Sequence, residues 1–151
     1  MGTSGAFLSD TKKDLTSKEG AEYSFYNCNF SNCVTRGILT NSGGAVIFAG
    51  QGKGIYTFEQ CTFSNNLSMA GGKESDVCDN GGGAIRWQLG DSKVSTGRFN
   101  NCSFYDNYAI GHGGAIFANG SLELNNCSIY QHFCCHNNHI VCKNCKECSA
   151  H

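Results

Sequence analysis

The chain repeats one nine-residue phrase four times, and this repetition constrains the fold more than any other feature. The phrase sets an apolar residue, a Cys and a second apolar residue at a fixed spacing and then adds a polar turn. Its copies are Phe25–Cys33, Phe58–Asn66, Phe99–Asn107 and Leu124–His132. A second phrase, Gly-Gly-Ala followed by Val or Ile, lies between these copies and ends at Val46, Ile85 and Ile116. Phrases that recur in the same order predict a repeat architecture in which successive repeats stack.

The spacing inside the first phrase predicts two short strands joined by a corner. Apolar residues at i, i+3 and i+5 fit neither a helical stripe nor an uninterrupted alternating strand. In the third copy, Phe99 would end one strand facing the core, and Asn100 and Asn101 would turn the chain. Cys102 and Phe104 would then face the core from the next strand. From repeat to repeat, the corner asparagines would stack on one another as a ladder.

The Gly-Gly-Ala phrase predicts one more strand in each repeat, which makes three strands per repeat. Its paired glycines indicate a corner that needs a positive φ. Burial of Arg86 without a partner would be costly, so we expect the column of Ile47, Arg86 and Phe117 to face solvent. Alternation along the strand then turns two other columns toward the core. These columns are Val46, Ile85 and Ile116, and Phe48, Trp87 and Ala118.

Composition agrees with short strands joined by turns. The chain has 151 residues with 20 Gly and no Pro, and the lack of Pro suits ladders that use every backbone N–H. A net charge of −1 with 15% charged residues predicts no nucleic-acid partner. No apolar run approaches the roughly 20 residues of a transmembrane helix. The polar N-terminus lacks the apolar run of a secretory signal, so we expect the chain to be a fragment if the protein is extracellular.

We expect three regions along the chain. Residues 1–20 are polar and fit a leader or partial coil, residues 21–133 hold the repeats, and residues 134–151 form a Cys- and His-rich tail or cap. The repeats are unequal in length, so surface insertions are expected around residues 67–80 and 89–96. Stacked coils leave apolar end faces that need caps, which predicts self-association through the coil ends in the isolated chain.

The two phrases together resemble the repeats of the polymorphic outer membrane proteins, first defined in chlamydial surface proteins. The Gly-Gly-Ala-Val/Ile motif stands at residues 43–46, 82–85 and 113–116, and the Phe-x-x-Asn motif at Phe63–Asn66 and Phe104–Asn107. Phe30–Cys33 departs from the second motif at its last position. The resemblance covers roughly residues 25–132. It implies an all-β, right-handed parallel β-helix, a solenoid here of about four three-sided coils, the fold that pectin lyases also use.

The resemblance also implies a non-enzymatic, adhesin-like protein of the cell surface, outer membrane or extracellular space. The partner would be a host or neighbouring surface protein or a glycan. Because binding residues usually lie on exposed loops and faces, we expect two sets of contact residues. One is an aromatic patch of Phe117, Tyr105 and Tyr130, and the other is an inserted loop with Lys73, Glu74, Asp76 and Asp79.

One Cys occupies the same position in every copy of the first phrase. These residues, Cys28, Cys61, Cys102 and Cys127, are expected to be small core residues, since free Cys is among the most buried residue types. Neighbouring coils lie about 4.8 Å apart, so Cα distances alone would permit a disulfide between two of them. We expect a column of four to remain thiols. Cys33 and Cys78 lie outside this column.

The tail concentrates five Cys and three His within residues 134–151. Cys142, Cys145 and Cys148 follow the short spacing that zinc sites use. The sequence therefore suggests a structural zinc ion held by these three thiolates and by His139 or His136. Disulfides in an oxidising compartment are an alternative, and a solvated tail without ligands is another. The odd total of 11 Cys excludes complete internal pairing.

Two other functions remain open at this point. A carbohydrate-active β-helix enzyme, of the pectin lyase kind, would need carboxylates or basic residues that converge on adjacent coils. No column contains two carboxylates, and no nucleophile motif is present, so no catalytic residue is predicted. A purely structural spacer would instead show a scattered polar surface without an exposed aromatic patch.

Overall fold

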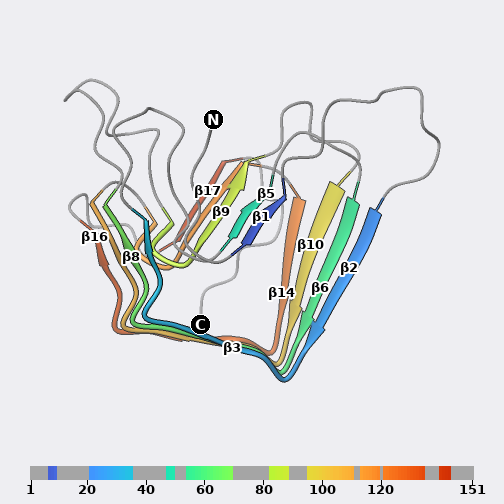
Figure 1. Cartoon of the computed structure of the whole chain (residues 1–151), viewed down its shortest axis with the longest axis horizontal. Coiled ribbons are helices and arrows are strands. Elements are labelled where there is room, and N and C mark those ends of the chain that lie inside the picture. The colour runs from blue at the N-terminus through green and yellow to red at the C-terminus, as the bar shows by residue number, and fades with distance from the viewer. Residues whose placement is uncertain are drawn as a thin grey trace.

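The structure, a computed structural model, describes residues 7–9, 21–35, 47–49, 54–69, 82–88, 95–110, 113–119, 121–134 and 140–143. These residues form an all-β arrangement in which every strand pairs in parallel with the equivalent strand of the neighbouring repeat (Figure 1). Within the described ranges no helix is long and apolar enough to span a membrane. The prediction of an all-β fold with parallel stacking is therefore confirmed.

Four sheets run along the stack of repeats. The first has the order β1-β5-β9-β13-β17 and contains Phe7–Ser9, Ile47–Ala49, Ile85–Gln88, Ile116–Asn119 and Ile140–Lys143. The second has the order β14-β10-β6-β2 and contains Ser121–Asn125, Ser95–Asn100, Gly54–Glu59 and Ala21–Tyr26. The third has the order β15-β11-β7-β3 and contains Ser128–Tyr130, Ser103–Tyr105, Thr62–Ser64 and Asn29–Ser31. The fourth has the order β16-β12-β8-β4 and contains Phe133–Cys134, Tyr108–Ala109, Leu67–Ser68 and Val34–Thr35.

The fourth sheet corrects the prediction of three strands per repeat. The polar end of each nine-residue phrase is a second corner, and a strand of only two residues follows it. The corner residue has a positive φ in every copy, at Asn32, Asn65, Asp106 and Gln131. A two-residue strand is too short to show alternation in a sequence, so its pairing is visible only once the repeats are stacked.

The predicted corners of the first phrase and of the Gly-Gly-Ala phrase are confirmed. Asn101 and Asn126 have φ values of 53° and 51°, which asparagine tolerates better than most residues. The side chains stack as expected, because Asn126 Nδ2 donates to Asn101 Oδ1 over 2.7 Å. At the glycine corner, Gly82 and Gly113 have φ values of 80° and 66°. A Cβ at Gly82 would lie 2.0 Å from the carbonyl oxygen of Ile85, so only glycine fits there.

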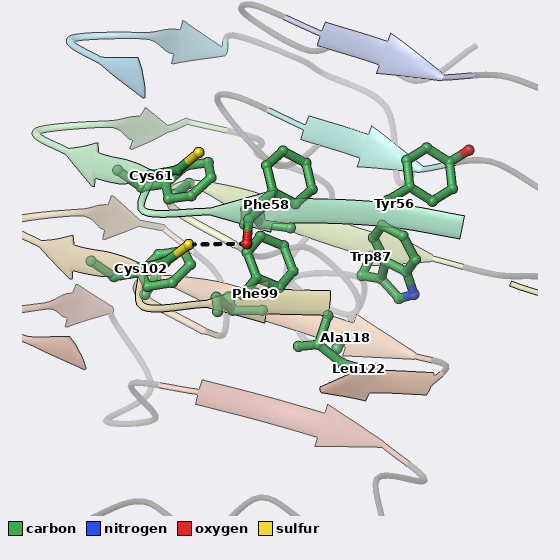
Figure 2. Packing of buried hydrophobic residues seen from close by; sticks show 14 residues of the cluster. Tyr56, Phe58, Cys61, Trp87, Phe99, Cys102, Ala118 and Leu122 are labelled. Carbon is green, nitrogen blue, oxygen red and sulfur yellow. Dashed lines mark hydrogen bonds between the residues drawn. The ribbon is translucent and has the colours of Figure 1, made fainter. Parts of the chain in front are cut away.

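The core is built from columns of aromatic rings that stack along the repeats (Figure 2). Phe58 lies 4.8 Å from Phe25 and 4.6 Å from Phe99, with rings parallel to within 4°. A second column has centroid distances of 5.0 and 4.7 Å and comprises Phe30, Phe63 and Phe104. The spacing matches the distance between paired strands. The ring stacks therefore hold the same register as the backbone ladders.

A third inward column changes residue type to make room for Trp87. It pairs Tyr23, Tyr56, Gly97 and Leu122 in register. Tyr23 stacks on Tyr56 at 5.0 Å, and the Trp87 ring meets Tyr56 edge-on at 4.9 Å and 90°. A Cβ at Gly97 would lie 3.1 Å from Trp87 and 3.0 Å from Leu122. Gly97 thus leaves the space that the indole fills.

The first sheet contains the strands of the Gly-Gly-Ala phrases, and we call it the Gly-Gly-Ala sheet. Its structure confirms one part of the prediction made for these strands and corrects two others. Ile85, Trp87, Ile116 and Ala118 are buried in the core, as expected. Arg86 and Phe117, however, are also buried, and the guanidinium carbon lies 5.3 Å from the centre of the Phe117 ring. The prediction that this column faces solvent was wrong, because the sheet is covered on both faces here and the aromatic ring receives the cation.

The register of the first Gly-Gly-Ala strand was also predicted wrongly. The structure pairs Ile47 with Ile85 and Phe48 with Arg86, one residue away from the alignment of the two motifs in the sequence. A shift of one residue exchanges the two faces of a strand. In the first copy, the backbone register is therefore offset by one residue from the alignment of the Gly-Gly-Ala motifs.

Two of the expected insertions are shorter than predicted. Leu67 and Ser68 form β8, and Ser95 and Thr96 open β10, because each pairs in register with neighbouring repeats. Residues 70–80 and 89–94 of the two insertions lie outside the described residues. Strand β1 falls within the expected leader, and β17 falls within the expected tail.

Candidate binding surface and cysteine column

The outer face of the fourth sheet carries an apolar strip. Val34, Leu67 and Tyr108 pair in register along β4, β8 and β12 and point outward. Their neighbours Thr35, Ser68 and Ala109 are buried on the opposite face. Val34 is 45% exposed and Tyr108 37% exposed, and Met69, at the end of β8, is 38% exposed. We call Val34, Leu67, Tyr108 and Met69 the apolar strip.

Two further tyrosines lie across the corner from this strip. Tyr105 and Tyr130 end β11 and β15, and their rings stack at 5.6 Å with an angle of 14°. Tyr130 is 49% exposed. Only the corner residues Asp106 and Asn107 separate Tyr105 from Tyr108 in the chain. The predicted patch residues Tyr105 and Tyr130 are thus brought together on an outer face, next to the strip.

The corner between these two sheets is fixed by a column of buried amides. Asn107 Oδ1 accepts from the Nδ2 and the backbone N–H of Asn66, over 2.9 and 3.1 Å. Asn107 Nδ2 donates to the carbonyl oxygen of Phe63 over 2.9 Å. At the next repeat, Nδ1 of the buried His132 accepts from the Asn107 backbone N–H over 3.2 Å. The hydrogen-bonded amides of Asn66 and Asn107 hold the corner in one geometry.

The rest of the predicted binding residues do not join this surface. Phe117 is only 4% exposed and lies under Arg86, so its place in the aromatic patch was predicted wrongly. The error follows from the wrong orientation of the Arg86 column. Lys73, Glu74, Asp76 and Asp79 lie outside the described residues. Their part in binding stays a prediction.

Sequence reasoning missed the apolar strip and the role of the ninth, last position of the phrase. The strip lies on two-residue strands, which give no periodic signal. The buried amides had a signal, since the phrase ends in Asn at both Asn66 and Asn107. A polar residue that recurs with the spacing of the core positions can belong to a buried network. The first copy has Cys33 here, whose backbone N–H donates to Asn66 Oδ1 over 3.0 Å.

The four cysteines of the phrase lie in one column on the inner side of the first corner. Cys61 and Cys102 are buried, while Cys28 and Cys127 at the two ends are half-buried, and all four are free thiols. The Cys102 Sγ lies 3.5 Å from the Phe58 carbonyl oxygen in the neighbouring repeat (dashed line in Figure 2). Cys127 Sγ lies 3.2 Å from the equivalent oxygen of Phe99. The predicted column of thiols is confirmed.

The thiols of the column differ in acidity. Burial raises the pKa of Cys61. A hydrogen bond to Cys127, together with burial, raises the pKa of Cys102. The same hydrogen bond stabilises the thiolate of Cys127 and lowers its pKa to about 7. At neutral pH, Cys127 therefore carries more thiolate than an ordinary cysteine.

Two acidic residues of the second sheet, Glu123 and Glu59, accept hydrogen bonds from different partners. Glu123 accepts from Arg98 Nε over 3.0 Å on the exposed face, a pair of the kind that contributes little to stability. Glu59 Oε1 accepts from Asn101 Nδ2 over 2.7 Å at the corner. Their register places these two carboxylates in different columns. No column of the described residues brings two carboxylates together, the arrangement that glycoside hydrolysis would need.

The predicted zinc ligands lie largely beyond what the structure describes. Strand β17 pairs the backbone of Cys142 with that of Ala118, so this part of the tail extends the Gly-Gly-Ala sheet. Cys145, Cys148, His139 and His136 lie outside the described residues. Within the described part of the chain, no three His, Cys, Asp or Glu residues are grouped to hold a metal ion.

Comparison with known proteins agrees with the repeat pattern. A search of curated proteins and a search of solved structures each found no match. The match comes from a family model, and it covers most of the second and third copies of the phrase together with the Gly-Gly-Ala phrases that follow them. Residues 60–86 and 101–119 of this chain match the model of the Chlamydia polymorphic membrane protein (Chlamydia_PMP) repeat.

Proposed function

We propose that this chain is a segment of an adhesin-like surface protein that binds a protein partner through the apolar strip and the Tyr105–Tyr130 pair. The repeat family is one of surface and outer-membrane proteins. In the proposal, the four sheets are the faces of a right-handed parallel β-helix. The exposed apolar strip on an outer face is the observation that carries the function.

The chemistry of this surface favours a protein partner over a glycan. Tyrosines and aliphatic side chains that sit together are the usual anchors of protein interfaces. The buried Asn66–Asn107 network beneath the corner keeps the surface rigid, which lowers the entropic cost of binding.

Binding to intact host cells tests the proposal. The labelled chain would be compared with Tyr108→Ser and Tyr130→Ser variants by flow cytometry, with Tyr26→Ser as the matched control. Tyr26 is 66% exposed on the second sheet, away from the strip. We expect each strip variant to lose roughly tenfold or more in apparent affinity, as for interface anchors, and the control to bind like the parent chain.

The alternatives make different predictions in the same experiment. A structural spacer would show no saturable binding by the parent chain, and that result would reject the proposal. Binding that is lost after glycosidase treatment of the cells but kept after protease treatment would replace the protein partner with a glycan. Turnover of polygalacturonate that survives repurification would favour the enzyme alternative.

Self-association is a second candidate function, favoured by the half-buried core residues at both ends of the stack. Phe25 and Phe30 lie at one end, and Leu124 and Ile129 at the other, and all four pack against the core without being fully buried. Edge strands with unpaired N–H and C=O groups can recruit further strands. Light scattering over a range of concentrations should show head-to-tail oligomers. A monomer at every concentration would reject this role.

A further inference from the structure

The last two thiols of the cysteine column lie on adjacent repeats at one end of the column. Cys102 is buried and Cys127 is half-buried. Each also lies beside a carbonyl oxygen of the preceding repeat. The two side chains are therefore neighbours in the column, and Cys127 is the one that solvent can reach.

The backbone already meets the requirement for a cross-link between these residues. Ser103 and Ser128 pair in register, and the Ser128 N–H donates to the Cys102 carbonyl oxygen over 2.9 Å. Cys102 and Cys127 thus precede two paired residues on adjacent parallel strands. Such strands lie about 4.8 Å apart, within the Cα range of roughly 4.4–6.8 Å found in disulfides.

The two thiols also differ in the way that a redox pair needs. The thiolate is the nucleophile toward peroxides and disulfides, and it must be reachable. Cys127 is the more accessible of the two, while Cys102 is shielded from solvent. An accessible attacking thiol next to a shielded resolving thiol is the arrangement of redox-sensing cysteine pairs.

We propose that Cys127 and Cys102 form a reversible disulfide when the protein meets a hydroperoxide, and that this bond fastens the last copy of the phrase to the one before it. The Cys127 thiolate attacks the O–O bond, forming a sulfenic acid and releasing an alkoxide that is protonated to an alcohol, or to water when the oxidant is hydrogen peroxide. The Cys102 sulphur then attacks the sulfenic sulphur, its proton leaves with the hydroxyl group as water, and the S–S bond forms. Two thiols are oxidised and one peroxide is reduced.

The position of the bond gives it a physical effect. The aromatic columns end before the last copy, where Leu124 pairs with Phe99 and Ile129 with Phe104. The core of this copy therefore lacks the ring stacking found between the other copies. A covalent link at Cys127 would restrain this end of the stack.

Peptide mapping of the oxidised full chain tests the proposal directly. The reduced protein would be treated with one equivalent of hydrogen peroxide at neutral pH, its remaining thiols blocked, and the chain cleaved without reduction at Arg98, Glu123 and Tyr130. These cuts leave Cys102 and Cys127 each as the sole cysteine of its peptide. We expect Cys102–Cys127 to be the first cross-link detected and dithiothreitol to reverse it.

Serine variants supply the controls, since a hydroxyl can still donate to the nearby carbonyl oxygens. Cys127→Ser and Cys102→Ser should abolish the cross-link, whereas Cys28→Ser, at the other half-buried end of the column, should keep it. Oxidation should also slow amide exchange in β15 of the parent chain and not in Cys127→Ser.

Two results in the unmutated chain would overturn the proposal without reference to any variant. One is a preferred link from Cys102 to Cys61, or from Cys127 to a tail cysteine. The other is Cys127 recovered as a sulfinic acid or as an unmodified thiol, with Cys102 still reduced.

Discussion

The buried amide column shows how single residues define this fold. Asn66 and Asn107 lie among apolar side chains, yet their amide groups bond to backbone atoms of the neighbouring repeats. Each amide therefore links neighbouring repeats and fixes the corner that carries the tyrosines. A satisfied polar group in a core favours one register over its neighbours, because any slip would leave it unpaired.

Replacement of Asn107 should be far more costly than its size suggests. Asn107→Ala leaves the Phe63 carbonyl and the Asn66 N–H groups without their partner. We expect a loss of about 2–5 kcal/mol in the free energy of unfolding, measured by urea denaturation. Asn125→Ala removes one exposed ladder bond to Asn100 and should cost less than about 1 kcal/mol. Equal losses in the two variants would contradict the role given to the buried amide.

The acidity of Cys127 can be measured by alkylation. Only the thiolate reacts with iodoacetamide, so the rate rises with pH as the thiol ionises. For Cys127 the half-maximal rate should fall near pH 7, because the hydrogen bond from Cys102 stabilises the thiolate and lowers its pKa to about 7. Cys102→Ala removes that hydrogen bond and should move the midpoint up toward the ordinary value of about 8.5. An unchanged midpoint would show that the Cys102 thiol is not the cause.

Strands in this molecule are held in place by side chains that stack along the repeats. The Phe25–Phe58–Phe99 and Phe30–Phe63–Phe104 columns meet edge-on, for example at 5.8 Å between Phe58 and Phe63. Offset-stacked and edge-on rings are both favourable arrangements. The third inward column, which begins with Tyr23 and Tyr56, has no ring at Gly97. The indole of Trp87, from the first sheet, fills the space beside Gly97 (Figure 2).

The fit between Gly97 and Trp87 leads to a prediction for β10. Gly97→Ala would place a methyl group 3.0–3.2 Å from Leu122 and Trp87, so at least one of these buried side chains must move. We expect a destabilisation of about 1–3 kcal/mol from overpacking, measured by chemical denaturation. Thr96→Ala, on the outer face of the same strand, should change stability by no more than about 0.5 kcal/mol. A more stable Gly97→Ala variant would show that the core has room here.

The repeat phrase was enough to predict the columns but not every face. Phe99, Cys102 and Phe104 recur with fixed spacing, so their inward direction and their stacking could be read from the sequence. Arg86 could not, because the cost of burying a cation was the only guide, and its position over Phe117 depends on a contact between strands. The register of Ile47 also depends on pairing rather than on motif alignment.

The candidate binding surface was predicted in part for the same reason. Tyr105 and Tyr130 occupy outward positions next to Phe104 and Ile129, so alternation placed them correctly. Tyr108 lies beyond a corner whose strand is two residues long, and no pattern in the sequence marks its direction. Phe117 was misplaced because its orientation was inferred from Arg86.

At the scale of the whole molecule, the chain is a stack whose repeats differ mainly at the ends. The two central copies are the best buried, and they are the copies at which the family model matches. The last copy loses both phenylalanines and places His132 at the end of the amide column. The ends are therefore where cross-links, caps or partners have most effect on stability.

The zinc prediction for the tail is tested by metal analysis of the whole chain. If Cys142, Cys145, Cys148 and His139 bind zinc, the purified protein should contain one equivalent, and Cys145→Ser should lose it. Cys135→Ser is the control, since this cysteine lies in the tail but outside the proposed ligand set. Removal of a structural zinc ion costs folding free energy, so chelation should lower the midpoint of thermal unfolding. Metal-free protein with these thiols paired as disulfides would contradict the prediction.

The central claim is that successive repeats lie in parallel and in register, and engineered cross-links test it most directly. Thr57 and Arg98 pair across β6 and β10 on the outer face. Mild oxidation of Thr57→Cys/Arg98→Cys should join them, as shown by mass spectrometry of unreduced peptides. Asn100 lies two residues further along β10, beyond the roughly 7 Å that a disulfide can bridge from Thr57. The stack predicts a cross-link in the first pair and none in Thr57→Cys/Asn100→Cys, and the opposite result would contradict the fold described for this chain.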